Sequence, residues 1–233
     1  KMLRELKKTG KPVVVVIFSG RPLILTEEDA EFSTLVEAWH GGTMAGEALC
    51  DILLGKVCPS GKITATFPRH IGQIPIYYNH LRTGRPYSGF WATTKYVDCV
   101  NEPLYPFGYG LSYTSFKYSD LQVTEGNQEV NVSFCLKNVG KYAGDEVAQI
   151  YVKLPERDKI MPIKELKGFE RISLKRGGSR KVTIRLKKDL LRYWDEEKGC
   201  FVHPSGDYTI MVGASSADIR LQKVSSITQK SGN

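Results

Sequence analysis

In the stretch Arg180-Lys181-Val182-Thr183-Ile184-Arg185-Leu186-Lys187, apolar residues alternate with polar ones. A period of two places the apolar side chains on one face of a strand and the basic side chains on the other. Similar short segments, separated by Gly- and Pro-containing turns, recur through the second half of the chain. The expected strands are Phe116–Val123, Glu129–Asn138, Glu146–Lys153, Lys164–Leu174, Arg180–Leu186 and Gly206–Ala214. About seven such strands without helical periodicity predict an immunoglobulin-like sandwich.

The sandwich is expected to be of the fibronectin type III-like kind. The Cys…Trp…Cys pattern of antibody domains is missing, although the strand spacing fits the same architecture. The Ser/Gln/Lys-containing tail after Lys223 is expected to be loosely ordered.

The first half has a different pattern. Val13–Phe18 is an uninterrupted apolar run, which is typical of a strand buried on both faces of a parallel sheet. Acidic residues at 27–29 mark a helix start, and Gly10 and Gly55 mark helix ends. The expected elements are helices over 2–9, 26–39 and 43–54 and strands over 13–18 and 62–67. Alternating strands and helices predict an α/β sandwich, here partial and N-terminally truncated because its sheet needs further strands.

Two domains are therefore expected, over residues 1–112 and 113–233. Residues 70–112 belong to the first domain but lack long periodic segments and are rich in Gly, Pro, Tyr, Asn and Arg. Such a stretch is too long for a simple connection, so we interpret it as a strap over a surface or as a functional segment.

Composition excludes several classes of protein. Hydrophobic residues make up 41% and charged residues 25%, which fits a folded chain, and no apolar run approaches the length of a membrane span. The net charge of +8 is concentrated in residues 113–233, which hold 21 Lys/Arg against 15 Asp/Glu. No nucleic-acid-binding signature accompanies this charge.

The five cysteines form no CxxC pair and no metal-ligand spacing with the histidines. We therefore expect free thiols and no metal or cofactor.

A series of short motifs follows one another along the chain. They include Gly20-Arg21-Pro22, Gly41-Gly42-Thr43-Met44-Ala45-Gly46-Glu47, Pro59-Ser60-Gly61-Lys62, Thr83-Gly84-Arg85-Pro86, Leu104-Tyr105-Pro106-Phe107-Gly108-Tyr109-Gly110-Leu111-Ser112-Tyr113 and Gly144-Asp145-Glu146-Val147. In this order they closely resemble the C-terminal half of glycoside hydrolase family 3, the β-glucosidase and β-xylosidase family. Each motif alone is weakly specific, whereas their common order makes the resemblance strong over about residues 5–220. One departure is His40, where the family commonly has proline.

The resemblance implies a retaining exo-glycosidase built from a TIM barrel, an α/β sandwich and a fibronectin-like domain. Retention needs two carboxyl groups about 5–5.5 Å apart. In the family the nucleophilic Asp lies on the barrel, and the acid/base Glu lies upstream of the strand that matches Val13–Phe18. Neither motif is present here, so we expect a C-terminal portion without catalytic residues.

The acidic residues within the chain have simpler interpretations. Residues 27–31 interact with a helix N-terminus, residues 195–197 lie in a solvated turn, and Asp145-Glu146 form turn hydrogen bonds. Asp98 and Glu102 lie in the strap without an identifiable partner.

Residues of the strap are the best candidates for contact with substrate. Aromatic faces and planar polar groups bind sugars through their C–H surfaces and hydroxyls. The alternative is that this segment only packs the α/β domain against its neighbours. The candidate sugar-binding residues are Tyr77, Tyr78, Asn79, Arg82, Arg85 and Trp91.

Two functional interpretations remain open. In the first, the chain shapes the active-site rim of an exo-β-glycosidase acting on oligosaccharides or on aryl or alkyl β-glycosides, and its partner is an N-terminal TIM barrel of the same polypeptide. A homodimer and a periplasmic or secreted location are compatible with this interpretation. In the second, the chain is a free-standing carbohydrate-binding or adhesion module whose sandwich binds the sugar.

Overall fold

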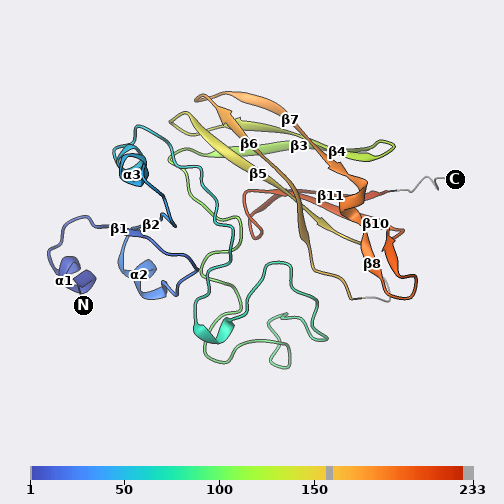
Figure 1. The fold of residues 1–233 in the computed structure, drawn as a ribbon, viewed down its shortest axis with the longest axis horizontal. Coiled ribbons are helices and arrows are strands. Elements are labelled where there is room, and N and C mark those ends of the chain that lie inside the picture. Colours follow the sequence, from blue (N-terminus) through green and yellow to red (C-terminus); the bar gives the residue numbers. More distant parts are fainter. Residues whose placement is uncertain (1, 156–159, 228–233) are drawn as a thin grey trace. The chain divides into compact units, whose positions relative to one another are not determined.

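The fold is described from a computed structural model, which covers residues 2–155 and 160–227. The chain divides into two compact units (Figure 1). The first unit comprises Lys1–Val57, Ala65–Ile76 and Lys95–Pro106, and the second comprises Cys58–Thr64, Tyr77–Thr94 and Phe107–Asn233. The chain therefore crosses between the units within the strap. The single domain boundary at residue 112 stays a prediction.

The first unit is a small α/β layer. Strands β1 (Val14–Ile17) and β2 (Thr34–Glu37) form a parallel pair. Val15 is buried, but Val14 and Phe18 are 44% and 58% exposed, so the described residues cover β1 on one face only. The helices are α1 (Met2–Lys8), α2 (Thr26–Glu31), α3 (Ala45–Leu53) and the 3-10 helix η1 (Ile71–Gln73).

The predicted helix over 26–39 is wrong in its second half. Helix α2 ends at Glu31, and the chain turns through Phe32 into β2. Thr34, Leu35 and Val36 pair in register with Val14, Val15 and Val16. The β-branched residues fit this pleated pairing, and the tertiary contact with β1 overrides the local helical pattern.

The predicted strand over 62–67 is also wrong. Only Phe67 forms an isolated bridge, to Tyr105. Phe67 is nevertheless almost completely buried, and its ring lies 5.9 Å from Trp39 and 6.0 Å from Tyr105. Trp39 packs in this aromatic cluster, and it follows strand β2 rather than ending the predicted helix over 26–39.

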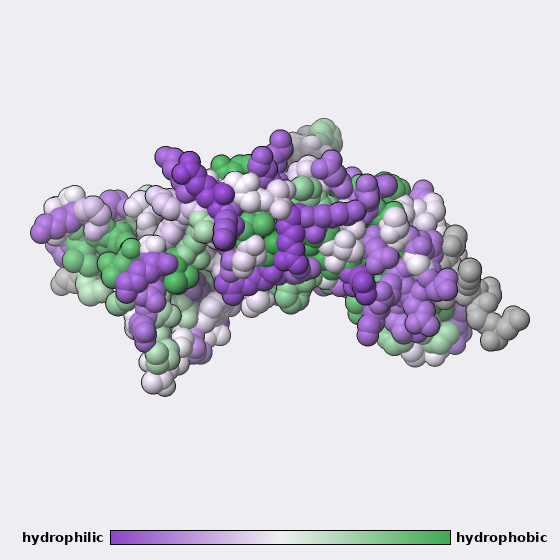
Figure 2. Space-filling view, turned by 90° about the horizontal axis from the view of Figure 1, so that it is seen from above, coloured by the Kyte–Doolittle hydropathy of each residue, from purple (hydrophilic) through white to green (hydrophobic). Residues whose placement is uncertain are grey.

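The second unit is the predicted β-sandwich. One sheet has the order β3-β4-β7 and the other has the order β11-β10-β5-β6, with antiparallel neighbours. Figure 2 looks from above, onto the side where β3, β4 and β7 lie, and shows many hydrophilic side chains there. The strands are β3 (Phe116–Glu125), β4 (Glu129–Asn138), β5 (Gly144–Lys153), β6 (Glu165–Leu174), β7 (Ser179–Lys187), β10 (Asp207–Gly213) and β11 (Ile219–Ser226).

The alternating residues of these strands form the core between the sheets. Val130, Val132, Phe134 and Leu136 of β4 are at most 1% exposed. Burying such side chains stabilises a fold by about 1.5–3 kcal/mol each before the loss of chain entropy. The second-half strands predicted from the sequence are confirmed to within a few residues at their ends.

Four elements in the described part of the second unit were not predicted. Strand β11 completes the second sheet, and the chain also forms the 3-10 helix η2 (Lys188–Leu191) and a hairpin of β8 (Tyr193–Asp195) and β9 (Cys200–Val202). The prediction of a loose tail after Lys223 is wrong as far as Ser226, which is still in β11, and residues 228–233 lie outside the described residues.

A buried ion pair joins the segment Cys58–Thr64 to the sandwich. The Lys62 ammonium lies 3.1 Å from the Glu146 carboxylate, with the two side chains 13% and 9% exposed. Lys62 also donates to the Gly110 carbonyl at 3.0 Å. The local hydrogen bond expected for Glu146 is present, because its carboxylate accepts from the Val147 N–H at 2.9 Å. The sequence did not predict that this carboxylate is also buried on β5 and paired with Lys62.

Candidate functional site

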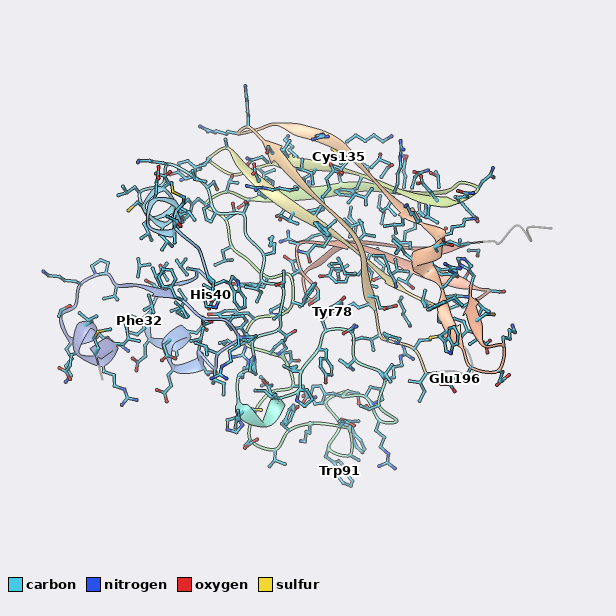
Figure 3. The ribbon with its side chains drawn as sticks, in the orientation of Figure 1. Phe32, His40, Tyr78, Trp91, Cys135 and Glu196 are labelled. Carbon is cyan, nitrogen blue, oxygen red and sulfur yellow. The ribbon has the colours of Figure 1, made fainter. Side chains whose placement is uncertain are left out.

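Tyr78 anchors the Tyr77–Thr94 segment to the sandwich unit (Figure 3). Its ring stacks on Phe107 with centroids 4.4 Å apart and meets the Tyr151 ring edge-on at 5.7 Å. Its hydroxyl accepts a hydrogen bond from the backbone N–H of Leu166 at 3.1 Å. The half-buried Tyr78 side chain thus uses one face, its edge and its hydroxyl in packing.

A network of hydrogen bonds fixes the ring of Tyr151 beneath Tyr78. The Tyr151 hydroxyl donates to the Gln149 side-chain oxygen at 2.5 Å, and the Gln149 amide donates to the carbonyls of Gly108 and Ala214. Burial, together with the nearby Tyr78, raises the pKa of Tyr151, so its phenol is neutral and acts as a donor. Gly108 has a φ of +80°, and a Cβ there would overlap the Gln149 amide.

The residues just before β6 also contact the Tyr77–Thr94 segment. The Ile163 N–H donates to the His80 carbonyl at 3.1 Å, and Leu81 forms an isolated bridge with Pro162. The Lys164 ammonium lies 5.9 Å from the centroid of the Tyr151 ring and donates to the Ser216 carbonyl. Burial lowers the pKa of Lys164. Residues 78–81 are therefore held by backbone and ring contacts.

The remainder of the segment forms a loop closed at its base. The Thr94 N–H donates to the Arg85 carbonyl at 2.8 Å. Within the loop, Phe90 and Trp91 lie 5.6 Å apart, and Trp91 is 77% exposed. We call residues 77–94 the rim loop.

The structure separates the six predicted sugar-binding residues into two groups. Tyr78 is a packing residue, and Figure 3 shows Trp91 at a distance from it, at the far end of the rim loop. The other candidates, Tyr77, Asn79, Arg82, Arg85 and Trp91, are exposed. Their role in binding sugar stays a prediction.

Sequence reasoning missed the partners of Tyr78. Gln149 and Tyr151 lie two residues apart in β5, and an Ile stands between them. A polar residue and a Tyr at this spacing share one face of the strand, which signals a buried polar contact on that face. The partner Phe107 lies far from Tyr78 in sequence, so no local pattern could pair the two rings.

Several acidic side chains of the described chain have hydrogen-bond or ion-pair partners. The Tyr105 hydroxyl donates to Asp29 at 2.5 Å, and Asp195 accepts from the N–H groups of Glu197 and Lys198. Within residues 2–155 and 160–227, no group of three or more His, Cys, Asp or Glu residues is placed to hold a metal ion, and all five cysteines are free. No helix in that part of the chain is both long and apolar enough to cross a bilayer.

Comparison with known families gives the context for this geometry. The glycosyl hydrolase family 3 C-terminal domain matches residues 1–113, and a fibronectin type III-like domain matches residues 146–216. A periplasmic beta-glucosidase of Salmonella typhimurium is 40% identical over 226 residues, which cover 94% of this chain and 29% of the relative. The chain belongs to glycoside hydrolase family 3.

Further relatives agree with this family 3 assignment. A beta-xylosidase of Formosa agariphila is 39% identical over 96% of the chain and 31% of its own length. The crystal structure of a beta-glucosidase from Listeria innocua in complex with isofagomine is 37% identical, with a TM-score of 0.90 over 97% of this chain and 32% of that one. The chain thus spans about a third of the length of these relatives and corresponds to their C-terminal part.

Proposed function

We propose that the chain is the C-terminal part of a retaining exo-β-glycosidase, a β-glucosidase that removes terminal non-reducing β-linked sugars. The observation that carries this proposal is the 40% identity to a beta-glucosidase along 94% of the chain. The substrates are oligosaccharides or aryl and alkyl β-glycosides, and the partner is an N-terminal TIM barrel of the same polypeptide.

In this proposal the rim loop contributes to the border of the active site. Tyr78 holds the base of the loop on the sandwich, while Tyr77, Asn79 and Trp91 face solvent. Exposed aromatic rings and planar amide or guanidinium groups suit contact with a pyranose and its hydroxyls. We assign these exposed residues, with Arg82 and Arg85, to the side of the pocket that holds the leaving group.

The two catalytic carboxylates come from elsewhere in the polypeptide in this account. A retaining mechanism needs a nucleophile and an acid/base about 5–5.5 Å apart. The most buried acidic side chains described here, Glu146 and Asp195, are engaged with Lys62 and with a turn. The chain by itself is therefore inactive.

Kinetics of the complete polypeptide test the assignment of the rim loop. Asn79→Ala and Arg85→Ala should raise KM for a disaccharide several-fold and change kcat less, because they remove contacts made in both ground and transition states. Arg185→Ala, which removes an exposed arginine from the sandwich, is the matched control. An unchanged KM in both loop variants would reject the assignment.

The location and the assembly of the protein are further parts of the proposal. A relative described as periplasmic supports a periplasmic or secreted location. We also infer that a homodimer forms. Fractionation of the native host and light scattering of the purified protein measure these two properties directly.

One observation favours the alternative of a carbohydrate-binding module. Trp194 and Phe201 are 52% and 58% exposed and lie 5.2 Å apart as cross-strand partners of the β8–β9 hairpin. An exposed aromatic pair is a suitable surface for a sugar ring. Affinity electrophoresis in a β-glucan gel distinguishes the two functions: retardation abolished by Trp194→Ala but not by Trp91→Ala would support the module.

A further inference from the structure

The outer face of the β3-β4-β7 sheet carries basic side chains in adjacent rows. Lys117 on β3 lies directly opposite Lys137 on β4. Lys181 on β7 pairs with Cys135, two residues from Lys137, and is therefore the diagonal neighbour of Lys137. All three lysines are exposed.

The turn between β6 and β7 adds two more cations at the same end of the sheet. Lys175 and Arg176 are exposed, and the turn is fixed beside β4 because the Asn138 N–H donates to the Gly178 carbonyl at 2.9 Å. We call Lys117, Lys137, Lys175, Arg176 and Lys181 the basic patch.

The basic patch is not neutralised by the protein. None of its five residues has an ion pair within the described ranges, whereas the neighbouring Arg171 and Arg180 contact Asp145 and Glu170. The carboxylates on β3 and β4 are Asp120, in the β3 bulge, Glu125, which pairs with Lys188, and Glu129, at the other end of β4 from Lys137. Like charges directly opposite each other destabilise a sheet, so the Lys117–Lys137 pair has a cost without a compensating contact.

Small polar side chains form the floor between these lysines. In the row of Lys181 the neighbours are Ser119 and Cys135, and Ser179 lies beside Lys137. The thiol of Cys135, which is labelled in Figure 3, lies 3.1 Å from the Ser179 hydroxyl. A polymer can therefore lie across the sheet close to hydroxyl groups, with the ammonium groups above it.

We propose that the basic patch binds an acidic polysaccharide, a chain of pyranose rings that carry carboxylate groups. Charge complementarity identifies an anion, and the hydroxyl floor suits the sugar hydroxyls between the charged groups. The five residues of the patch are all Lys or Arg, and the exposed Val139 and Tyr142 lie outside it, in the turn after β4. The patch itself therefore has no apolar side chain to insert into a bilayer and no aromatic ring on which a nucleobase stacks. The choice of a polysaccharide among anionic polymers rests on the proposed glycosidase function.

Affinity electrophoresis of the chain in gels containing polygalacturonate tests the proposal without requiring hydrolysis. Retardation should weaken strongly between about 50 and 200 mM salt, because screening reduces contacts between exposed charges. The triple variant Lys117→Gln, Lys137→Gln, Lys181→Gln should lose about tenfold in affinity, since each exposed charge contributes modestly.

A charge-matched control separates the patch from net charge. Lys11, Lys95 and Lys223 are exposed and have no ion pair in the described chain. Their triple change to Gln should leave affinity within about threefold, because none of the removed charges belongs to the basic patch. Equal loss in both triples, or no retardation of the unmodified chain, would overturn the proposal.

Two further probes test the class of ligand. The first probe is vesicles that contain anionic lipid, and the second is duplex DNA. Each should bind the chain more weakly than polygalacturonate does at the same salt concentration. Tighter binding to either would overturn the assignment of the occupant. If the unmodified chain does not bind polygalacturonate while the complete polypeptide hydrolyses β-glucosides, this inference alone is rejected and the proposed function stands.

Discussion

At the scale of single residues, the Tyr78 side chain holds the base of the rim loop on the sandwich through its stack on Phe107 and its hydrogen bond from Leu166. Tyr78→Ala removes the stack on Phe107 and should lower the free energy of unfolding by about 2–4 kcal/mol. Tyr78→Phe keeps the ring and loses only the hydrogen bond from Leu166, so it should cost about 1 kcal/mol. Urea denaturation measures both. Tyr77→Ala, at an exposed position, should change stability little, and equal effects at positions 77 and 78 would contradict the anchor.

Gly108 offers a second residue-scale prediction. Gly108→Ala should destabilise the chain by more than about 1 kcal/mol, because an L residue is strained at a φ of +80° and its Cβ overlaps the Gln149 amide. Gly46 is the matched control, since it lies within α3 and a Cβ added there would meet no other atom within 4 Å. Gly46→Ala should stabilise by about 0.5–1 kcal/mol. Thermal unfolding of the two variants should therefore shift in opposite directions.

His203 should give the stability a pH dependence. Burial and the charge of Arg192 lower its pKa in the folded chain below the usual 6.5. The unfolded chain then binds more protons at mildly acidic pH, so this contribution is complete above pH 6.5 and is lost as the pH falls towards the lowered pKa. His203→Gln should flatten that part of the stability curve. An identical slope in both proteins between the two pKa values would show that His203 is not responsible.

At the scale of elements, the strands of the sandwich were predictable because each buries one face. In β4 and β7 the apolar period of two matches the observed burial residue by residue. The β8–β9 hairpin escaped prediction because its strands have three residues each, too few to show a period. Strand β11 was missed because apolar and polar residues alternate only weakly in its sequence, and few of its side chains are even partly buried.

The first unit was harder to predict for a different reason. Its strands β1 and β2 are four residues long and are defined by each other across an intervening helix. A local pattern cannot show that Thr34–Glu37 pairs with Val14–Ile17, and the acidic helix start at Thr26 made the whole segment look helical. The candidate site shows the same limit: exposed loop residues could be named from composition, but the partners of Tyr78 come from distant parts of the chain.

At the scale of the whole molecule, we predict that residues 113–233 fold without the preceding residues. This fragment lacks Lys62 and Tyr78, so Glu146 is left buried without its cation and Tyr151 loses its ring contact with Tyr78. It should therefore unfold cooperatively but at a lower temperature than the whole chain. Glu146→Gln should recover part of the difference in the fragment and destabilise the whole chain. A non-cooperative transition in the fragment would contradict a domain boundary near residue 113.

We propose that this family 3 chain supports a β-glycosidase without carrying its catalytic carboxylates. The most direct measurement is release of nitrophenol from aryl β-glucoside and β-xyloside by the purified chain, beside the complete polypeptide. Loss of both carboxylate roles removes most of the rate enhancement of a retaining enzyme, so we predict turnover by the complete polypeptide and none by the chain. Turnover by the chain that equals that of the complete polypeptide and persists through repurification would contradict the account.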